Sequence, residues 1–170
     1  MLREMIKAQV PGLYVFHRGE ESGGIGSRYI ADHTPGAVKG LQAAIAFDRK
    51  GTNSIITHQM RGRCCSDDFG ESVAGLLNMQ HGLDTGGSFT DTANYTNLIG
   101  ECSNISVGFQ WEHSKWESLN IPYIASLREA VIAADWSKLT YKRKPGETDW
   151  PTYNPSSRYG MYGDYGDDYV

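Results

Sequence analysis

Carboxylate and imidazole side chains of this sequence gather where predicted strands end. Glu20 and Glu21 follow a short apolar run, Asp48 ends a second run, and His113 follows a third. Carboxylate and imidazole together suit Zn²⁺, and two adjacent glutamates can divide the work, one binding metal and the other handling the proton of an attacking water. These residue types therefore point to metal-assisted hydrolysis.

Each of these residues also has a plain structural interpretation. Glu20 and Glu21 can form an exposed acidic turn, Asp48 can be a turn-forming aspartate, and His113 can be a surface histidine. Taken singly, none of them indicates a metal site. Their order along the chain and their sequence context favour the chemical interpretation.

The elements that must position these side chains alternate between helix and strand. Ser66 is placed to cap a helix, and Gly82 is expected to end it. Helices are predicted at residues 1–9, 66–82 and about 124–131, and strands at 13–16, 43–47, 54–57 and 104–109. This alternation predicts an α/β fold, a mostly parallel or mixed sheet flanked by helices, which binds ligands beyond the carboxyl ends of its strands.

The composition divides the chain into a domain at residues 1–140 and a linker with a Tyr/Gly/Asp-rich tail at 141–170. Residues 142–146, KRKPG, form the expected linker. Residues 151–170 lack the apolar residues of a core, which favours a flexible tail. The alternative is a docking segment, because the five tyrosines of this stretch can supply contact area on another surface.

Charge and hydropathy exclude several classes of function. With 170 residues, 39% of them hydrophobic, the chain has the composition of one globular domain, and its net charge of -4 argues against nucleic acid as a partner. No run approaches the roughly 18 apolar residues that a membrane span requires. The odd cysteine count, Cys64, Cys65 and Cys102, is more typical of a reducing cytoplasm than of a disulfide-bonded secreted protein.

Four spaced segments resemble motifs of the di-zinc aminopeptidase and carboxypeptidase family. Residues 19–27, GEESGGIGS, resemble its GEE-x-G-x-x-GS segment. Residues 46–48, AFD, are similar to its strand-end aspartate. Residues 84–91, DTGGSFTD, are similar to its glycine-pair loop, and residues 112–114, EHS, to its late histidine. The motifs occur in the family's order, and the resemblance spans about residues 15–135.

The resemblance implies a three-layer zinc-exopeptidase domain that hydrolyses peptide or amide bonds near a chain end. It implies that Glu20 is the general base and that two zinc ions are bound. The implied zinc ligands are Glu21, Asp48 and His113. The residues implied to line the peptide cleft are Asp91, Gly86 and Gly87.

The sequence departs from the family before residue 19. Family members carry an upstream histidine and a metal-bridging aspartate there, whereas His17 is the only histidine and no aspartate occurs before Asp32. The domain is therefore expected to be N-terminally truncated, with the missing ligands supplied by a second polypeptide or a homo-oligomer. Two alternatives are a non-catalytic structural or assembly subunit, and replacement of a ligand by His33, His58 or His81.

Overall fold

The centre of the molecule is a four-stranded mixed sheet. The computed structural model describes residues 1–59 and 62–147, and the strand order of the sheet is β1-β6-β2-β5. Strand β1 runs parallel to β6, β6 antiparallel to β2, and β2 parallel to β5. The bounds are β1 Ala43–Arg49, β2 Ser54–Ile56, β5 Gly82–Asp84 and β6 Glu101–Ser106. Two small antiparallel pairs complete the strands, β3 (His58–Gln59) with β4 (Gly62–Arg63), and β7 (Phe109–Gln110) with β8 (Ser118–Leu119).

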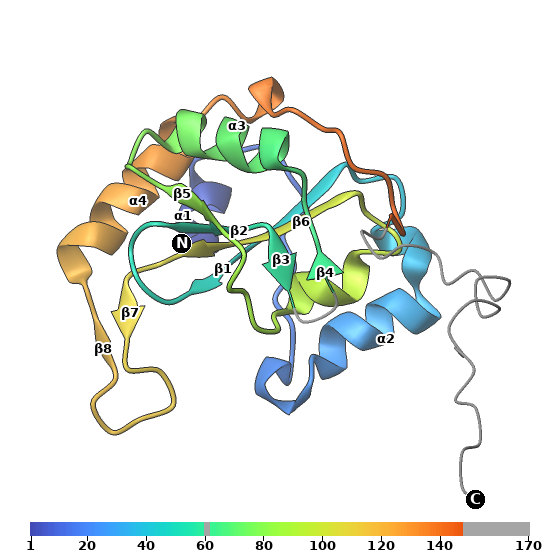
Figure 1. The fold of residues 1–170 in the computed structure, drawn as a ribbon, viewed down its shortest axis with the longest axis horizontal. Coiled ribbons are helices and arrows are strands. Elements are labelled where there is room, and N and C mark those ends of the chain that lie inside the picture. The colour runs from blue at the N-terminus through green and yellow to red at the C-terminus, as the bar shows by residue number, and fades with distance from the viewer. Residues whose placement is uncertain (60–61, 148–170) are drawn as a thin grey trace, which may run out of the picture.

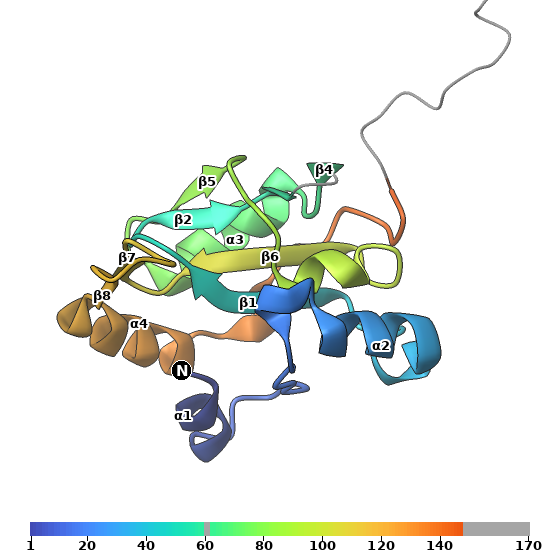
Figure 2. The same cartoon turned by 90° about the horizontal axis from the view of Figure 1, so that it is seen from below.

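Helices cover both faces of this sheet, which confirms the predicted α/β class (Figures 1 and 2). The helices are α1 Leu2–Lys7, α2 Ile25–His33, α3 Asp67–Leu77 and α4 Ile121–Ala133. The 3-10 turns are η1 Glu20–Ser22, η2 Pro35–Ala37, η3 Asp91–Tyr95 and η4 Trp136–Lys138. Within the described ranges, none of the helices has the length and apolar character needed to cross a membrane.

The sheet separates two apolar cores, because neighbouring residues of a strand point to opposite faces. Ile55 packs into a core formed with α1, α3 and α4, where Phe69 and Leu127 are buried. Ile56, the next residue, packs on the other face, in a smaller core that includes Tyr95 and draws on residues of α2. Because the side chains of Ile55 and Ile56 point to opposite faces, strand β2 packs against helices on both sides of the sheet.

Helix α3 begins as predicted but ends earlier. The Ser66 Oγ accepts a hydrogen bond from the Phe69 backbone N–H at 3.1 Å, which is the expected N-cap. Asn78, with a left-handed φ of 49°, ends the helix. The prediction that Gly82 ends it was wrong, since Gly82 begins β5. Asparagine is the residue that most readily replaces glycine in this conformation.

The strand predicted at residues 13–16 is absent. The segment has no ladder partner among the described residues, and the side chains of Leu13 and Phe16 are 56% and 70% exposed. An apolar run becomes a buried strand only when neighbouring strands or helices cover it, and none reaches these two side chains. The Tyr14 hydroxyl instead donates to the Val10 carbonyl at 2.6 Å, which ties the segment locally to the end of α1.

Residues 141–147, which include the predicted linker, pack against the body of the domain. The buried carboxylate of Glu101 accepts hydrogen bonds from the Lys142 and Arg143 backbone N–H groups, both at 2.8 Å. The same carboxylate accepts from the Ser66 N–H at 2.7 Å and from its hydroxyl at 2.9 Å. The domain boundary at residue 140 stays a prediction, and the predicted tail, residues 151–170, lies outside the described residues.

Candidate functional site

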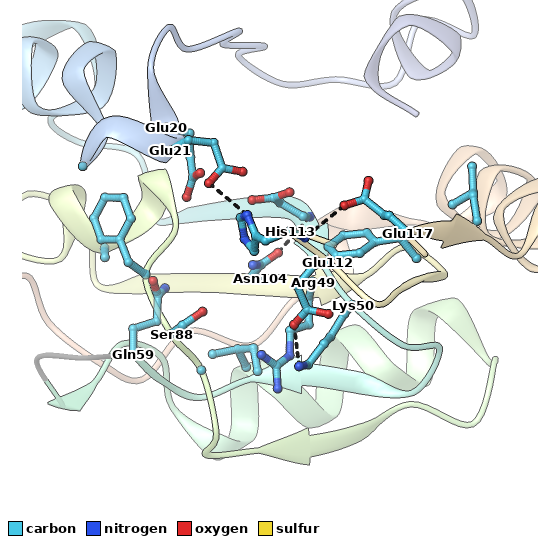
Figure 3. A pocket seen from close by; sticks show the side chains of 18 of the residues that line it. Glu20, Glu21, Arg49, Lys50, Gln59, Ser88, Asn104, Glu112, His113 and Glu117 are labelled. Carbon is cyan, nitrogen blue, oxygen red and sulfur yellow. Dashed lines mark hydrogen bonds and ion pairs between the residues drawn. The ribbon is translucent and has the colours of Figure 1, made fainter. Parts of the chain in front are cut away.

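A cleft of about 1070 Å³ lies beyond the carboxyl ends of β1 and β6. It gathers the four residues predicted for the metal site from three separate stretches of the chain. These residues are Glu20, Glu21, Asp48 and His113. In Figure 3, Glu20 and Glu21 approach the cleft from one side and His113 from the other. The cleft is thus shared by residues that lie more than 90 positions apart in the sequence.

The pair Glu20 and Glu21 occupies the one-turn helix η1, and glycines shape this turn. Gly19 and Gly23 flank it with left-handed φ angles of 69° and 80°. A Cβ on Gly26 would lie 2.8 Å from the Arg18 backbone nitrogen, so the start of α2 packs closely against the residues that precede the turn. The glycines of this segment therefore allow the tight turn that places two consecutive carboxylates at the cleft.

Asp48 reaches the cleft because β1 is irregular at its end. The register with β6 runs regularly from Ala43 to Ala46 and then shifts before Arg49. At this bulge the Asp48 backbone N–H donates to the side-chain Oδ1 of Asn104 at 2.9 Å instead of to a strand carbonyl. The Thr90 hydroxyl contacts the Asp48 carboxylate at 3.4 Å. The bulge thus sets the direction in which the Asp48 side chain leaves the sheet.

His113 lies in the loop that joins β7 to β8. It has a left-handed φ of 59°, and its backbone N–H donates to the Glu117 carboxylate at 3.2 Å. Its Nδ1 lies 3.7 Å from Glu21 Oε2, and both side chains are largely exposed. An exposed ion pair of this length contributes little to stability. The contact shows that the loop and η1 meet across the cleft (Figure 3).

The carboxylates of the cleft disfavour one another's ionised form. Burial raises the pKa of Glu20, and the negative charges of Asp48, Glu21 and Asp91 raise it further. The pKa of Asp48 is likewise raised, first by burial and then by Glu21 and Asp91, against a lowering by the Thr90 hydroxyl. A bound cation would relieve this repulsion.

Asp91 lies behind the cleft wall instead of lining the cleft. Its carboxylate accepts a hydrogen bond from the buried Ser27 hydroxyl at 2.5 Å and contacts His17 Nδ1 at 3.0 Å. The other ring nitrogen of His17 shares a hydrogen bond of 2.6 Å with the Tyr95 hydroxyl. This network joins α2, η3 and the residues before η1. Through these contacts Asp91 helps to position η1, the turn that carries Glu20.

The two glycines predicted to line the cleft differ. Gly87 lines it, and a Cβ there would lie 2.2 Å from the His58 carbonyl oxygen, so only glycine fits. Gly86 is not among the lining residues, and its N–H donates to Asp84 Oδ1 at 2.7 Å. The proposed replacement ligands His33, His58 and His81 also do not line the cleft. His81 is buried and shares a hydrogen bond of 2.8 Å with the Tyr123 hydroxyl.

Sequence reasoning missed several residues that line the cleft. Arg49 and Lys50 bring positive charge to one wall, where they contact Asp84 at 3.3 Å and Glu112 at 2.5 Å. Asn104 lines the floor from β6, although it is only 6% exposed. A polar amide inside a buried central strand was the available signal, because asparagine is unfavourable there unless it has a specific partner.

The described residues alone do not fit a zinc ion. Within residues 1–59 and 62–147 there is no group of three or more His, Cys, Asp or Glu side chains that could hold a metal ion. A catalytic zinc site has three protein ligands. Glu21 and His113 approach each other, whereas Asp48 reaches the same cleft without joining them in a common ligand group.

The mixed sheet and its two helical layers define an α/β domain whose fold is similar to that of a solved aminopeptidase structure. The chain is similar to PhTET1-12s, solved as a dodecamer, with a TM-score of 0.59 and 20% identity over 78% of this chain and 46% of that chain. It is also similar to aminopeptidase APDkam598 from the archaeon Desulfurococcus kamchatkensis, with a TM-score of 0.52 and 20% identity over 76% of this chain and 44% of that chain. The chain therefore spans less than half the length of either protein. The sequence matches no protein-family model and shows no significant similarity to any curated protein.

Proposed function

We propose that this chain forms part of a zinc-dependent exopeptidase and carries its general base and part of its metal ligands. The observation that carries the proposal is the convergence of Glu20, Glu21, Asp48 and His113 on one cleft. The shared fold with a solved aminopeptidase supports it. The substrate class is a peptide whose terminal bond is hydrolysed.

Glu20 is the proposed general base. It lies in the cleft on the turn η1, and its raised pKa makes it a better proton acceptor than an ordinary surface glutamate. In this role Glu20 takes a proton from the attacking water and returns it to the leaving amine, so the carboxylate is regenerated at the end of the cycle. We assign no other step to a residue of this chain.

The proposed ligands Glu21, Asp48 and His113 require additional ligands from outside the described residues. Two zinc ions are expected in the completed site, and a second polypeptide or a second copy of this chain is the proposed source of the missing side chains. The negative cleft supports this proposal, because two carboxyl groups with raised pKa values lie where a cation would stabilise both.

Activity and metal content test the proposal together. The full chain, alone and with any co-purifying partner, is assayed for bound zinc and for hydrolysis of amino-acyl p-nitroanilides. We expect Glu20→Gln to lower kcat by about 100-fold or more while the zinc content stays unchanged. Glu71→Gln, at an exposed position of α3, is the matched control and should retain activity. Hydrolysis that survives Glu20→Gln would contradict the proposed role of Glu20.

The second candidate function is a non-catalytic subunit of an assembly. It is favoured by the lack of a three-ligand group in the described part of the chain. In that case neither zinc nor turnover appears in any purified complex, and Glu20→Gln leaves assembly unaltered. Zinc that binds tightly and is lost in a Glu21→Gln, His113→Ala double variant would exclude this candidate.

A further inference from the structure

Asn104 is a buried polar side chain at the cleft that has no role in the proposed chemistry. It lies on the central strand β6, is 6% exposed, and lines the floor of the cleft near His113 (Figure 3). Its partner in the parallel register is Ala46, two residues before Asp48. The amide therefore sits at the point where the sheet meets the candidate catalytic residues.

The orientation of the Asn104 amide is determined by the bulge in β1. Its Oδ1 accepts the Asp48 backbone N–H at 2.9 Å. The reversed amide would bring its NH₂ group against that N–H, so two donors would face each other, and this arrangement is unfavourable. The Nδ2 group must therefore point the other way.

The Nδ2 group has no hydrogen-bond partner in the described part of the chain, whereas Oδ1 is satisfied. Nδ2 is not among the fully buried side-chain atoms that lack a partner in the described residues, so it is open to the cleft and water can accept from it. The bulge uses the acceptor oxygen of Asn104 and leaves its donor facing the cleft. A ligand in the cleft can take this donor in place of water.

We propose that Asn104 Nδ2 donates a hydrogen bond to a backbone carbonyl oxygen of the peptide bound in the cleft. This inference rests on the proposed peptidase function. The acceptor is assigned as a backbone carbonyl because an amide NH₂ group needs an acceptor and each peptide unit of the substrate carries one. Asn104 is then a substrate-contacting residue that places the peptide relative to Glu20.

The side-chain NH₂ signal of Asn104 tests this contact directly. The full chain, with any co-purifying partner, is labelled with ¹⁵N-asparagine and carries Glu20→Gln to prevent cleavage. The signal is assigned by its loss in Asn104→Asp, and Ala-Ala-Ala is titrated as the probe. We expect the Asn104 signal to shift with the bound fraction. We also expect Asn104→Leu to weaken binding by about two- to tenfold, the effect of one hydrogen bond, and Asn104→Asp to weaken it at least as much.

Asn104→Asp keeps the acceptor for the Asp48 N–H but adds a negative charge, so the shift of the Asn104 NH₂ signal carries the test if Asn104→Leu does not fold. Asn97→Asp, at an exposed position outside the cleft, is the matched control and should bind the peptide like the parent chain. If the peptide is bound and, without Glu20→Gln, cleaved, while the Asn104 signal and the affinities of both variants stay unchanged, the inference is wrong and the peptidase function stands. If the chain neither binds nor cleaves the peptide, both are wrong.

Discussion

Asp48 and Glu20 are held where their negative charge is unfavourable. The pKa of each carboxyl is raised, first by burial and then by neighbouring carboxylates. Such a group binds its proton more tightly in the folded chain than in the unfolded chain. The free energy of unfolding therefore falls as the pH rises from the carboxyl pKa of the unfolded chain to the higher pKa of the folded chain. The full loss of stability is present at neutral pH.

Asp48→Asn should consequently stabilise the chelator-treated protein at pH 7. Because Asp48 borders an open cleft, the effect is small, and we expect Tm to rise by about 1–2 °C. At pH 3 the carboxyl is protonated in both states, so the gain should vanish. Thermal unfolding at the two pH values measures the difference, with Glu71→Gln as a control that shows no such dependence. A variant that is less stable than the parent chain at pH 7 would refute the assignment.

The glycine loop offers a second test at the scale of single residues. Gly87→Ala places a methyl group against the His58 carbonyl, a backbone atom that cannot rotate away, and should cost about 1–3 kcal/mol of unfolding free energy. Gly75→Ala, in α3, meets no atom within 4 Å and should stabilise the protein by about 0.5–1 kcal/mol. Urea unfolding measures both. Equal effects of the two substitutions would show that the loop is not closely packed.

At the scale of elements, one buried carboxylate joins three parts of the fold. Glu101 starts β6 and accepts four hydrogen bonds, two from Ser66 at the cap of α3 and two from the backbone of Lys142 and Arg143. Three of these donors are backbone N–H groups, which need a partner when they are buried. Glu101 therefore holds the 141–147 segment on the domain.

Glu101→Ala should cost about 3–5 kcal/mol, because it leaves these donors without an acceptor. Glu101→Gln keeps one acceptor oxygen and should cost less. Urea unfolding measures the loss, and trypsin cleavage after Lys142 or Arg143 should be faster in both variants than in the parent chain. If cleavage there is unchanged while stability falls, the carboxylate does not hold the segment.

Elements with local signals were predictable from the sequence, and those that depend on distant partners were not. Strands β1 and β2 and the Ser66 cap follow from apolar runs and a capping residue a few positions apart. The run at residues 13–16 is equally apolar, but it forms no strand because no other described element covers the side chains of Leu13 and Phe16. The cleft residues Glu20, Asp48 and His113 came from a motif resemblance. The place of Asn104 in a buried strand was a local signal, but its contact with Asp48 depends on a bulge in another strand.

At the scale of the whole molecule, the sheet is open at β1. Within residues 1–59 and 62–147 this strand pairs with β6 alone. The exposed side chains of Leu13 and Phe16 precede the turn that carries Glu20. Open sheet edges and exposed apolar residues favour association with another chain. This is the surface at which we expect a partner or a second copy to complete the site.

Phe16→Glu should therefore weaken association of the 18.8 kDa chain without lowering its Tm, because the side chain is already 70% exposed. Sedimentation velocity over a range of concentrations measures the shift. Ile121→Glu, which changes a residue of similar exposure at the start of α4, is the matched control. Unchanged sedimentation of the Phe16 variant would exclude this segment as the contact.

All three cysteines of the chain are free and buried, and burial raises the pKa of Cys102. A thiol reagent can therefore modify them only when the structure opens around them. Because Cys64 and Cys102 lie in the core on one face of the sheet and Cys65 in the core on the other, their separate modification rates would report whether the two helical layers detach together or one at a time. The wild-type chain thus carries its own chemical probes of partial unfolding.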